Sequence, residues 1–561
     1  MSDALARIRA FDGEGLPQEL PQDDFMAALV AALASAEVEL RTAALRVVEE
    51  VVAKVDYYMT DPPGGDLSMW VHGVARQVIA RVDLIAARLA DDVIEIRAFA
   101  AKIASELARM VHSDWYAVGE HIGLTLALVK QQLANPLAEL AAEPDPRTLA
   151  PALRALGYLE PGGSRLRAAL GNQDEQVRLA AVEALTSFDK LAHAELVALL
   201  ADPAGSVRAA AVRGLREASD LAPLLPLVED PVPDVRLATI EALATIGAAG
   251  VDLPIARRLA DSSGEVRVAA ARILPGLARE LRPGGRADRD MWTAEIVPAL
   301  IAALDDRALR LDAAAALAEC EDPRAVPRLV ALLDEDIDAG TFDHVVAALS
   351  WTGDPRAVPA LQRLYRDAED SEPRSWRPTV VRRVWREALR RNLVTALARC
   401  GAPQSITLVR RWLASRDVYH QRVATGVLGD VGTAADVPRL RELLDHEDLH
   451  VRAGAARSIA RLEPAAAGEA ALLDKLLEPL ELRDIQAFHV SNYFQPAAVG
   501  LQALAKVDAH IGPRVRAALR TAIETVRQVS TETSYAHEHR ADVRRFLAIA
   551  QACLDLWQDH P

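Results

Sequence analysis

The sequence predicts an all-α fold, an α-solenoid superhelix of about a dozen antiparallel helix pairs. The first indication is a block that recurs four times between Leu170 and Leu274, as LGNQDEQVRLAAVEAL, LADPAGSVRAAAVRGL, VEDPVPDVRLATIEAL and LADSSGEVRVAAARIL. The arginines of these blocks are 28 to 31 residues apart, the length of a helix–turn–helix repeat. The second indication is composition, because 51% of the residues are apolar and only 4% are aromatic. That balance favours stacked helices over sheets.

Each block predicts a turn followed by the second helix of a pair. An apolar stripe with helical period follows the arginine, as at Ala180, Ala181, Ala184 and Leu185. We expect a short polar residue in each turn to accept the N–H groups that open the next helix. These residues are Asn172, Asp202, Asp230 and Asp261. The second helices also carry alternating charges, which predict a row of ion pairs between neighbouring repeats. These are Glu183, Arg213, Glu241 and Arg272.

The pattern divides the chain into five segments. We expect a leader over 1–21, degenerate repeats with insertions over 22–165, regular repeats over 166–320, longer repeats with a basic segment over 321–463, and a helical cap over 464–561. Helices are predicted over 22–34, from Leu40, from Ile96, over Thr379–Arg399, within 403–432 and 434–462, and near 511–530 and 540–558.

A turn motif of the form D-P-x-A-V-P appears in the second half of the chain. It reads EDPRAVPRL at 321–329, GDPRAVPAL at 353–361 and, more loosely, AADVPRL at 434–440. With the blocks above, it makes residues 22–463 resemble HEAT repeats, especially the bacterial kind found in phycobilin lyases. The resemblance implies an α-solenoid that is usually a binding scaffold. HEAT repeats also occur in a DNA glycosylase group, in phycobilin lyases and in a di-iron hydroxylase, so an enzyme remains an alternative.

Charge is unevenly distributed along the chain. The net charge of −16 argues against general affinity for nucleic acids. Residues 374–441 nevertheless hold 14 arginines, no lysine and four acids, so this window is +10 and the remainder of the chain is −26. On its first helix Arg382, Arg386 and Arg390 share one face. Two interpretations stay open: the acidic run just upstream, from Asp367 to Glu372, neutralises the arginines, or they bind carboxylates or phosphates of a partner.

Aromatic residues are scarce but gather where the repeats are interrupted. They either hold the inserted loops onto the array or serve as anchors for a partner. We therefore predict a partner-binding surface made of basic-segment residues and aromatic residues of the interruptions. Its members are Trp376, Arg382, Arg383, Trp385, Arg386, Arg390, Arg391, Tyr493 and Phe494.

One stretch, His446–His450, formally satisfies the H-E-x-x-H zinc motif. The repeat register places it in an inter-repeat turn, where two histidines do not share a helix face. The pairs His446-Glu447 and His537-Glu538 are similar to the iron-binding pairs of the hydroxylase, but that family needs four in register. We expect no metal, no cofactor and no catalytic residue, since the sequence holds no P-loop, G-x-S-x-G or C-x-x-C motif.

The cysteines Cys320, Cys400 and Cys553 are scattered, which predicts free thiols in a reducing compartment. The first residues do not form a signal peptide, and no apolar run is long enough to span a membrane, so we expect a cytoplasmic protein. The predicted function is a non-enzymatic scaffold or adaptor that binds an acidic protein segment on its concave surface and insertion loops. No small-molecule ligand is evident. The alternatives are a nucleic-acid binder similar to the glycosylases, which the net charge disfavours, and an enzyme of the lyase or hydroxylase kind.

Overall fold

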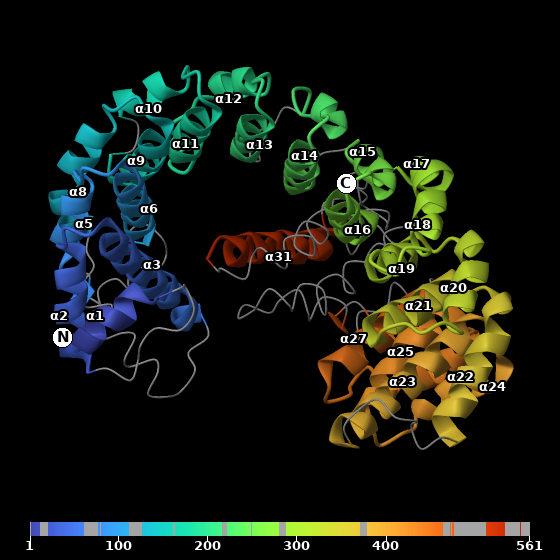
Figure 1. Cartoon of the computed structure of the whole chain (residues 1–561). Helices are drawn as coiled ribbons and strands as arrows, with labels where there is room; N and C mark the ends of the chain where they lie inside the picture. Colours follow the sequence, from blue (N-terminus) through green and yellow to red (C-terminus); the bar gives the residue numbers. More distant parts are fainter. Residues whose placement is uncertain are drawn as a thin grey trace. The chain divides into compact units, whose positions relative to one another are not determined.

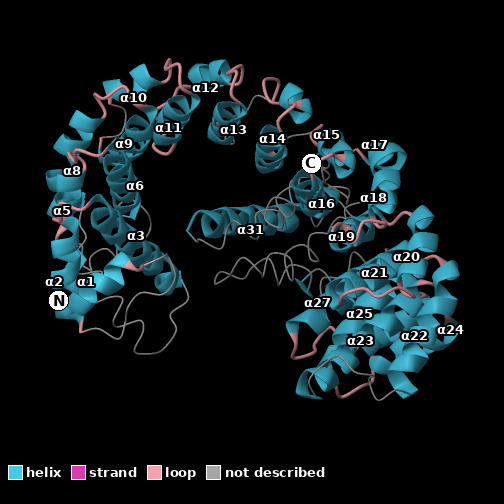
Figure 2. Cartoon of the chain, in the orientation of Figure 1, coloured by secondary structure: helices cyan, strands magenta, loops and turns pink. Residues whose placement is uncertain are grey.

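The computed structural model confirms an all-α fold. It describes residues 2–11, 21–60, 74, 77–78, 80–110, 126–160, 163–215, 221–247, 250–279, 288–370, 379–463, 472, 474–475, 512–532 and 550. These residues form helices and no strand (Figure 1, Figure 2). The chain divides into two compact units, Met1–Ile246 and Gly247–Pro561.

Unit 1 is a stack of helix pairs. The second helix of each pair packs on the second helix of the next, so that these helices form one layer, which we call the inner layer. In unit 1 the inner layer consists of α3 (Val38–Thr60), α6 (Ile94–Met110), α9 (Pro146–Leu159), α11 (Glu175–Thr186), α13 (Gly205–Gly214) and α14 (Pro233–Ile246). The first helices are α2 (Gln22–Leu33), α5 (Val82–Arg88), α8 (Leu126–Leu140), α10 (Ser164–Ala169), α12 (His193–Leu199) and the 3₁₀ helix η1 (Leu225–Glu229).

Small residues allow the inner helices to approach one another closely. A Cβ atom added at Gly157 of α9 would collide with the side chain of Ala184 on α11. Ala180, Ala181 and Leu185 of the predicted stripe are fully buried. The periodicity read from the sequence is therefore the packing face of the stack.

The first ten described residues correct the expectation of a leader. Ser2–Arg9 form a helix, α1, that packs on α2 and α3. Its Ala4 and Ile8 are one turn apart and buried, as is Phe11 just beyond it. Residues 2–11 thus belong to the first packed layer of unit 1.

Unit 2 continues the same architecture. Its inner layer contains α16 (Gly264–Ala278), α19 (Arg310–Cys320), α21 (Ala339–Thr352), α23 (Thr379–Arg399), α25 (Val418–Val431) and α27 (Leu449–Leu462). The other elements are α15 (Asp252–Arg257), η2 (Arg258–Ala260), α17 (Arg289–Met291), the π-helix η4 (Trp292–Ile296), α18 (Val297–Ala303), η5 (Pro323–Ala325), α20 (Val326–Leu332), η6 (Pro355–Ala357), α22 (Val358–Asp370), α24 (Pro403–Trp412), η7 (Ala434–Asp436), α26 (Val437–Arg441) and α31 (Gly512–Glu532). The predicted helix over Thr379–Arg399 is confirmed.

The D-P-x-A-V-P turns have a simple local cause. Asp322 caps η5 by accepting the N–H of Arg324 at 2.9 Å, and Asp354 caps η6 in the same way through Arg356 at 2.8 Å. The proline that follows each aspartate takes the first helical position, where an N–H is not needed. The motif therefore begins the first helix of a repeat.

Trp292 is fully buried and belongs to the core of unit 2. Its indole Nε1 donates to the carboxylate of Asp252 at 2.7 Å. For this aromatic residue the structure supports the packing interpretation rather than exposure to a partner.

Candidate binding surface

An arginine–aspartate clamp joins the regular repeats of unit 1. Arg178 donates two hydrogen bonds of 2.9 Å to Asp202, and Arg208 donates two to Asp230, of 2.9 and 2.7 Å. The remaining Nη1 of Arg208 donates to the carbonyl oxygens of Asp202 and Pro203 in its own turn. Each arginine thus holds the turn before it and the repeat after it through bidentate pairing.

The turn aspartates serve both this clamp and the start of the helix that follows. Asp202 accepts the N–H of Ala204, the N-cap residue of α13, at 2.8 Å. Burial favours the neutral acid, but hydrogen bonds from Arg178 and Ala204 hold the pKa of Asp202 below its ordinary value. The pKa of Asp230 is lowered in the same manner by Arg208 and the N–H of Val232. The expected role is therefore confirmed for these residues, because Asp202 and Asp230 accept the N–H groups of Ala204 and Val232, each directly before the next helix.

The predicted row of alternating charges differs at Glu183. This carboxylate accepts from Arg154 on the preceding inner helix at 2.8 Å. Arg213 is exposed and has no ion pair within the described part of the chain. The counterion of Glu183 is therefore Arg154 in the preceding repeat, and not Arg213 in the following one.

The structure describes only some of the predicted partner-binding residues. Trp376, Tyr493 and Phe494 lie outside the described residues. Four more lie on the described backbone of α23, but their side chains are outside the described part: Arg382, Arg383, Trp385 and Arg386. The remaining two contact aromatic rings. The guanidinium of Arg390 lies 5.9 Å from the ring centre of Tyr365, and that of Arg391 lies 5.7 Å from the ring of Tyr419.

Tyr419 lies at the N-terminal end of the inner-layer helix α25. Its side chain is 62% exposed, and Arg422 approaches the same ring at 5.3 Å. Arg422 is also bound to Asp448 in the next repeat. Arg391 has no carboxylate partner among the described residues. Its guanidinium lies beside an exposed aromatic ring.

Several other arginines of the basic window are neutralised one repeat later. Arg410 donates to both oxygens of Asp436, at 2.8 and 3.1 Å, and Arg441 lies 3.4 Å from Glu463. The first pair has two hydrogen bonds, as the clamps of unit 1 do, and the second is a single contact between more exposed side chains. Both place part of the +10 charge in contacts within the chain.

The C-terminal ends of the inner helices carry a set of residues that we call the arginine cluster: Arg399, Arg457 and Arg461 around Asp430. Arg399 donates to Oδ2 of Asp430 at 2.8 and 3.1 Å, and Arg461 approaches Oδ1 at 2.5 Å. Arg399 also lies 3.8 Å from the ring centre of Trp351 and 3.3 Å from Oγ of Ser350. The cluster thus spans α21, α23, α25 and α27, which follow one another in Figure 1.

Arg457 has the least neutralised charge of the cluster. Its only hydrogen bond to a described residue runs from Nη2 to the carbonyl oxygen of Gly426 at 3.3 Å, and its enclosed Nε has no partner there. Burial lowers the pKa of Arg457, the positive charges of Arg461 and Arg399 lower it further, and Asp430 opposes them. Three guanidinium groups here share one carboxylate.

Sequence reasoning missed this cluster, although a signal exists. Arg399, Asp430 and Arg461 are each 31 residues apart, as are Gly426 and Arg457. Residues one repeat length apart lie side by side in the inner layer, so opposite charges at that spacing indicate contact. In the basic segment, charges that share a face of one helix do not reveal such pairs.

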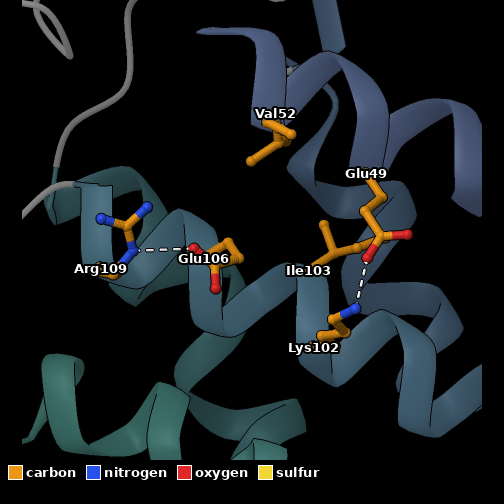
Figure 3. Close-up of a pocket in the computed structure, with 7 residues that line it drawn as sticks. Glu49, Val52, Lys102, Ile103, Glu106 and Arg109 are labelled. Atoms are coloured by element: carbon orange, nitrogen blue, oxygen red, sulfur yellow. Dashed lines mark hydrogen bonds and ion pairs between the residues drawn. The ribbon is translucent and has the colours of Figure 1, made fainter. Parts of the chain in front are cut away.

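A depression lies in unit 1, between α3 and α6. It has a volume of about 250 Å³ and an apolar floor made by Val52, Ala53 and Ile103. Two ion pairs flank the floor, Lys102–Glu49 at 2.7 Å and Arg109–Glu106 at 2.9 Å (Figure 3). Because acids and bases are balanced among the residues that line it, this depression favours neither sign of ligand charge.

The H-E-x-x-H stretch begins in the turn that the register predicted, and its last two residues open α27. Asp448 caps α27 by accepting the N–H of Val451 at 3.1 Å, and His446 accepts the N–H of Asp448 through Nδ1 at 3.0 Å. His537 and Glu538 lie outside the described residues. Within the described part of the chain no group of three or more His, Cys, Asp or Glu side chains is arranged to hold a metal ion.

The described cysteines are buried free thiols. Burial raises the pKa of Cys320 to about 12 and that of Cys400 to about 11. Both thiols therefore stay protonated at neutral pH, where they are weak nucleophiles. Among the described helices none is long and apolar enough to cross a lipid bilayer.

The comparison with protein families agrees with the repeat architecture. HEAT repeats match residues 133–216, 193–275, 297–377 and 382–460. The similar solved structures include importin beta in an ammonium sulfate condition (12% identity, TM-score 0.37, 99% of this chain and 86% of that chain). They also include a Kap95:Nup1 complex, with 13% identity and a TM-score of 0.35 over 96% of this chain and 78% of that chain. A Kap121p mutant matches with 13% identity and a TM-score of 0.36 over 100% of this chain and 76% of that chain. No curated protein matches. The matched repeats cover more than half of the sequence, and the chain belongs to the HEAT-repeat family.

Proposed function

We propose that the protein is a non-enzymatic binding scaffold whose partner is an acidic protein segment, held on the inner layer of α23, α25 and α27. The observation that carries the proposal is the charge on this layer. Among the described residues, Arg391, Arg399, Arg457 and Arg461 are accompanied by one carboxylate partner, that of Asp430, whereas each clamp in unit 1 pairs one arginine with one aspartate.

The chemistry of these side chains favours carboxylates. Guanidinium groups bind carboxylates with two parallel hydrogen bonds, and they are less strongly hydrated than ammonium groups. Exposed aromatic surface is offered by Tyr419 at the N-terminal end of α25 and by Trp351 at the C-terminal end of α21. A partner segment with acidic and apolar side chains would therefore find complementary groups along three repeats.

A short acidic segment fits the charge distribution better than a nucleic acid does. A double-stranded nucleic acid carries one negative charge per about 1.7 Å and needs an extended basic track. Outside the window 374–441 the chain has a net charge of −26, which repels a long polyanion.

Titration of the full chain with a fluorescently labelled polyglutamate peptide tests the proposal. The variant changes the five predicted arginines of α23 to glutamate: Arg382, Arg383, Arg386, Arg390 and Arg391. The matched control makes the same change at five exposed arginines without a described ion pair: Arg46, Arg165, Arg213, Arg257 and Arg307. We expect the variant to bind more weakly by about tenfold, or 1.4 kcal/mol, and the control to bind like the wild type within about threefold.

Equal losses of affinity in the variant and the control would show that only the net charge of the chain matters for binding, and would contradict the proposal. Tighter binding of a single-stranded oligonucleotide than of the peptide, with a steep dependence on salt, would instead favour the nucleic-acid alternative. Circular dichroism checks that both variants remain helical. Capture from a native lysate with the wild type and the variant then identifies the natural partner.

A further inference from the structure

The arginine cluster has an excess of positive charge that the described chain does not neutralise. Asp430 accepts from Arg399 through Oδ2 and from Arg461 through Oδ1, and the described residues show no hydrogen bond between Arg457 and either oxygen. Arg457 is partly buried and donates only to a backbone carbonyl. A guanidinium has five N–H donors, and a charge that is held away from water without a counterion destabilises the fold.

The geometry points to a receiving site: we propose that Arg399, Arg457 and Arg461 bind a carboxylate of the acidic partner segment, and that Asp430 partly occupies the site until the partner arrives. This proposal rests on the proposed function, whose surface it narrows to one cluster. A carboxylate that enters beside Asp430 can accept from Arg457 and from the half-exposed Arg461, whose side chain is 45% accessible.

The neighbouring side chains define what accompanies the carboxylate. Trp351 is 39% exposed and lies against Arg399, so its accessible surface adjoins the cluster. An apolar residue next to the acid in the partner can pack there. The segment that fits best therefore places a glutamate or an aspartate beside an apolar residue, and acidic side chains elsewhere in it gain less from this site.

Asp430 has two consequences for affinity. As long as it is ionised, it competes with the incoming carboxylate for Arg399 and Arg461, and it repels that carboxylate. Replacing it by asparagine keeps its size and removes its charge. The cluster would then hold three positive charges and no negative one, so an acidic segment should bind more tightly.

The test compares Arg457→Met with Arg411→Met in the full chain, with the labelled polyglutamate peptide as the probe. Arg411 is an exposed arginine of α24 in the same basic window, but it lies in the first-helix layer. We expect Arg457→Met to weaken binding about tenfold and Arg411→Met to change it less than about twofold. Asp430→Asn should strengthen binding about threefold.

Arg461→Met supplies a second variant in case Arg457→Met does not fold, because the Arg461 side chain is half exposed. It should weaken binding by a similar factor. If wild type binds the peptide and both arginine variants bind equally well, the cluster is not the receiving site, while the proposed function stands. If Asp430→Asn weakens binding, Asp430 is not a competitor and that part of the proposal is wrong. If the wild type does not bind the peptide, the proposed function and this site fail together.

Discussion

Arginine and aspartate side chains form ion pairs in two regions of this molecule, and the two regions differ in the ratio of arginines to aspartates. In the regular repeats of unit 1 each arginine has its own aspartate: the Arg208 and Asp230 side chains are 11% and 5% exposed, and each clamp is satisfied by two hydrogen bonds. At the ends of α23, α25 and α27 three arginines share Asp430, and Arg461 is half exposed. The same two residue types thus form a closed structural contact in one region and an open, charged one in the other.

The difference assigns the clamps of unit 1 to the stability of the fold and the arginine cluster to the binding of a partner. A balanced buried pair stabilises the fold only while both members are present, because either member alone is an uncompensated charge. A cluster with more arginines than aspartates can be neutralised further by a carboxylate of an external partner. Variants in the two regions should therefore have effects of different size and of opposite sign.

The largest effect is expected for Asp230→Asn. This change leaves the buried guanidinium of Arg208 without its carboxylate, and it should lower the free energy of unfolding by about 3 kcal/mol. Urea denaturation of the full chain, followed by far-ultraviolet circular dichroism, measures it. The control is Asp334→Asn, whose partner Arg363 forms an ion pair with both side chains more than half exposed, and which should cost less than about 1 kcal/mol. Equal losses in the two variants would show that the clamp contributes no more than a surface pair.

The effect of pH sharpens the same contrast. The folded state lowers the pKa of Asp202 and Asp230 below the ordinary value of 3.8, so their ionised forms stabilise the fold. This stabilisation is complete above the unfolded pKa and disappears as the pH falls through the lowered one. The difference in unfolding free energy between wild type and Asp230→Asn should be constant above about pH 5 and shrink below about pH 4. A difference that already shrinks between about pH 6 and pH 8 would assign it to another group, such as a histidine.

The smallest effect, and one of opposite sign, is expected for Arg457→Met. Methionine keeps much of the aliphatic packing of the arginine and removes a poorly neutralised charge, so the free energy of unfolding should rise by about 1 kcal/mol. Thermal melting measures it, beside Arg208→Met as the matched variant in a balanced clamp, which should melt at a lower temperature. If Arg457→Met also melts lower, the guanidinium contributes to the stack, and the contrast between the two regions is weaker than we infer.

Much of the architecture could be predicted because it depends on local spacing. The helical stripe at Ala180 and Ala181, the capped turns at Asp322 and Asp354, and the helix over Thr379–Arg399 all follow from rules that act within about one helical turn or one turn motif. The register of the repeats also placed His446 in a turn, against the apparent zinc motif.

Contacts between repeats were harder to predict. The recurring arginines and the turn aspartates were both visible in the sequence, but only stacking shows that Arg208 meets Asp230, 22 residues later. Glu183 was expected to meet Arg213 in the next repeat and instead meets Arg154 in the previous one, because a charge pattern does not specify from which side a neighbour reaches it. Within the first ten residues, Ile8 is buried by helices α2 and α3, which no local rule indicates.

By itself, the sequence determined the helical repeat, its length, its turns and the excess of arginine over residues 374–441. The tertiary structure decided which of those arginines are neutralised. Arg410 and Arg422 find carboxylates one repeat later, whereas Arg399 shares the carboxylate of Asp430 with Arg461, which lies beyond this window. The reason is physical: helical periodicity follows from hydrogen bonds and apolar spacing within a segment, whereas neutralisation depends on which side chains the stacking of separate segments brings within a few ångströms.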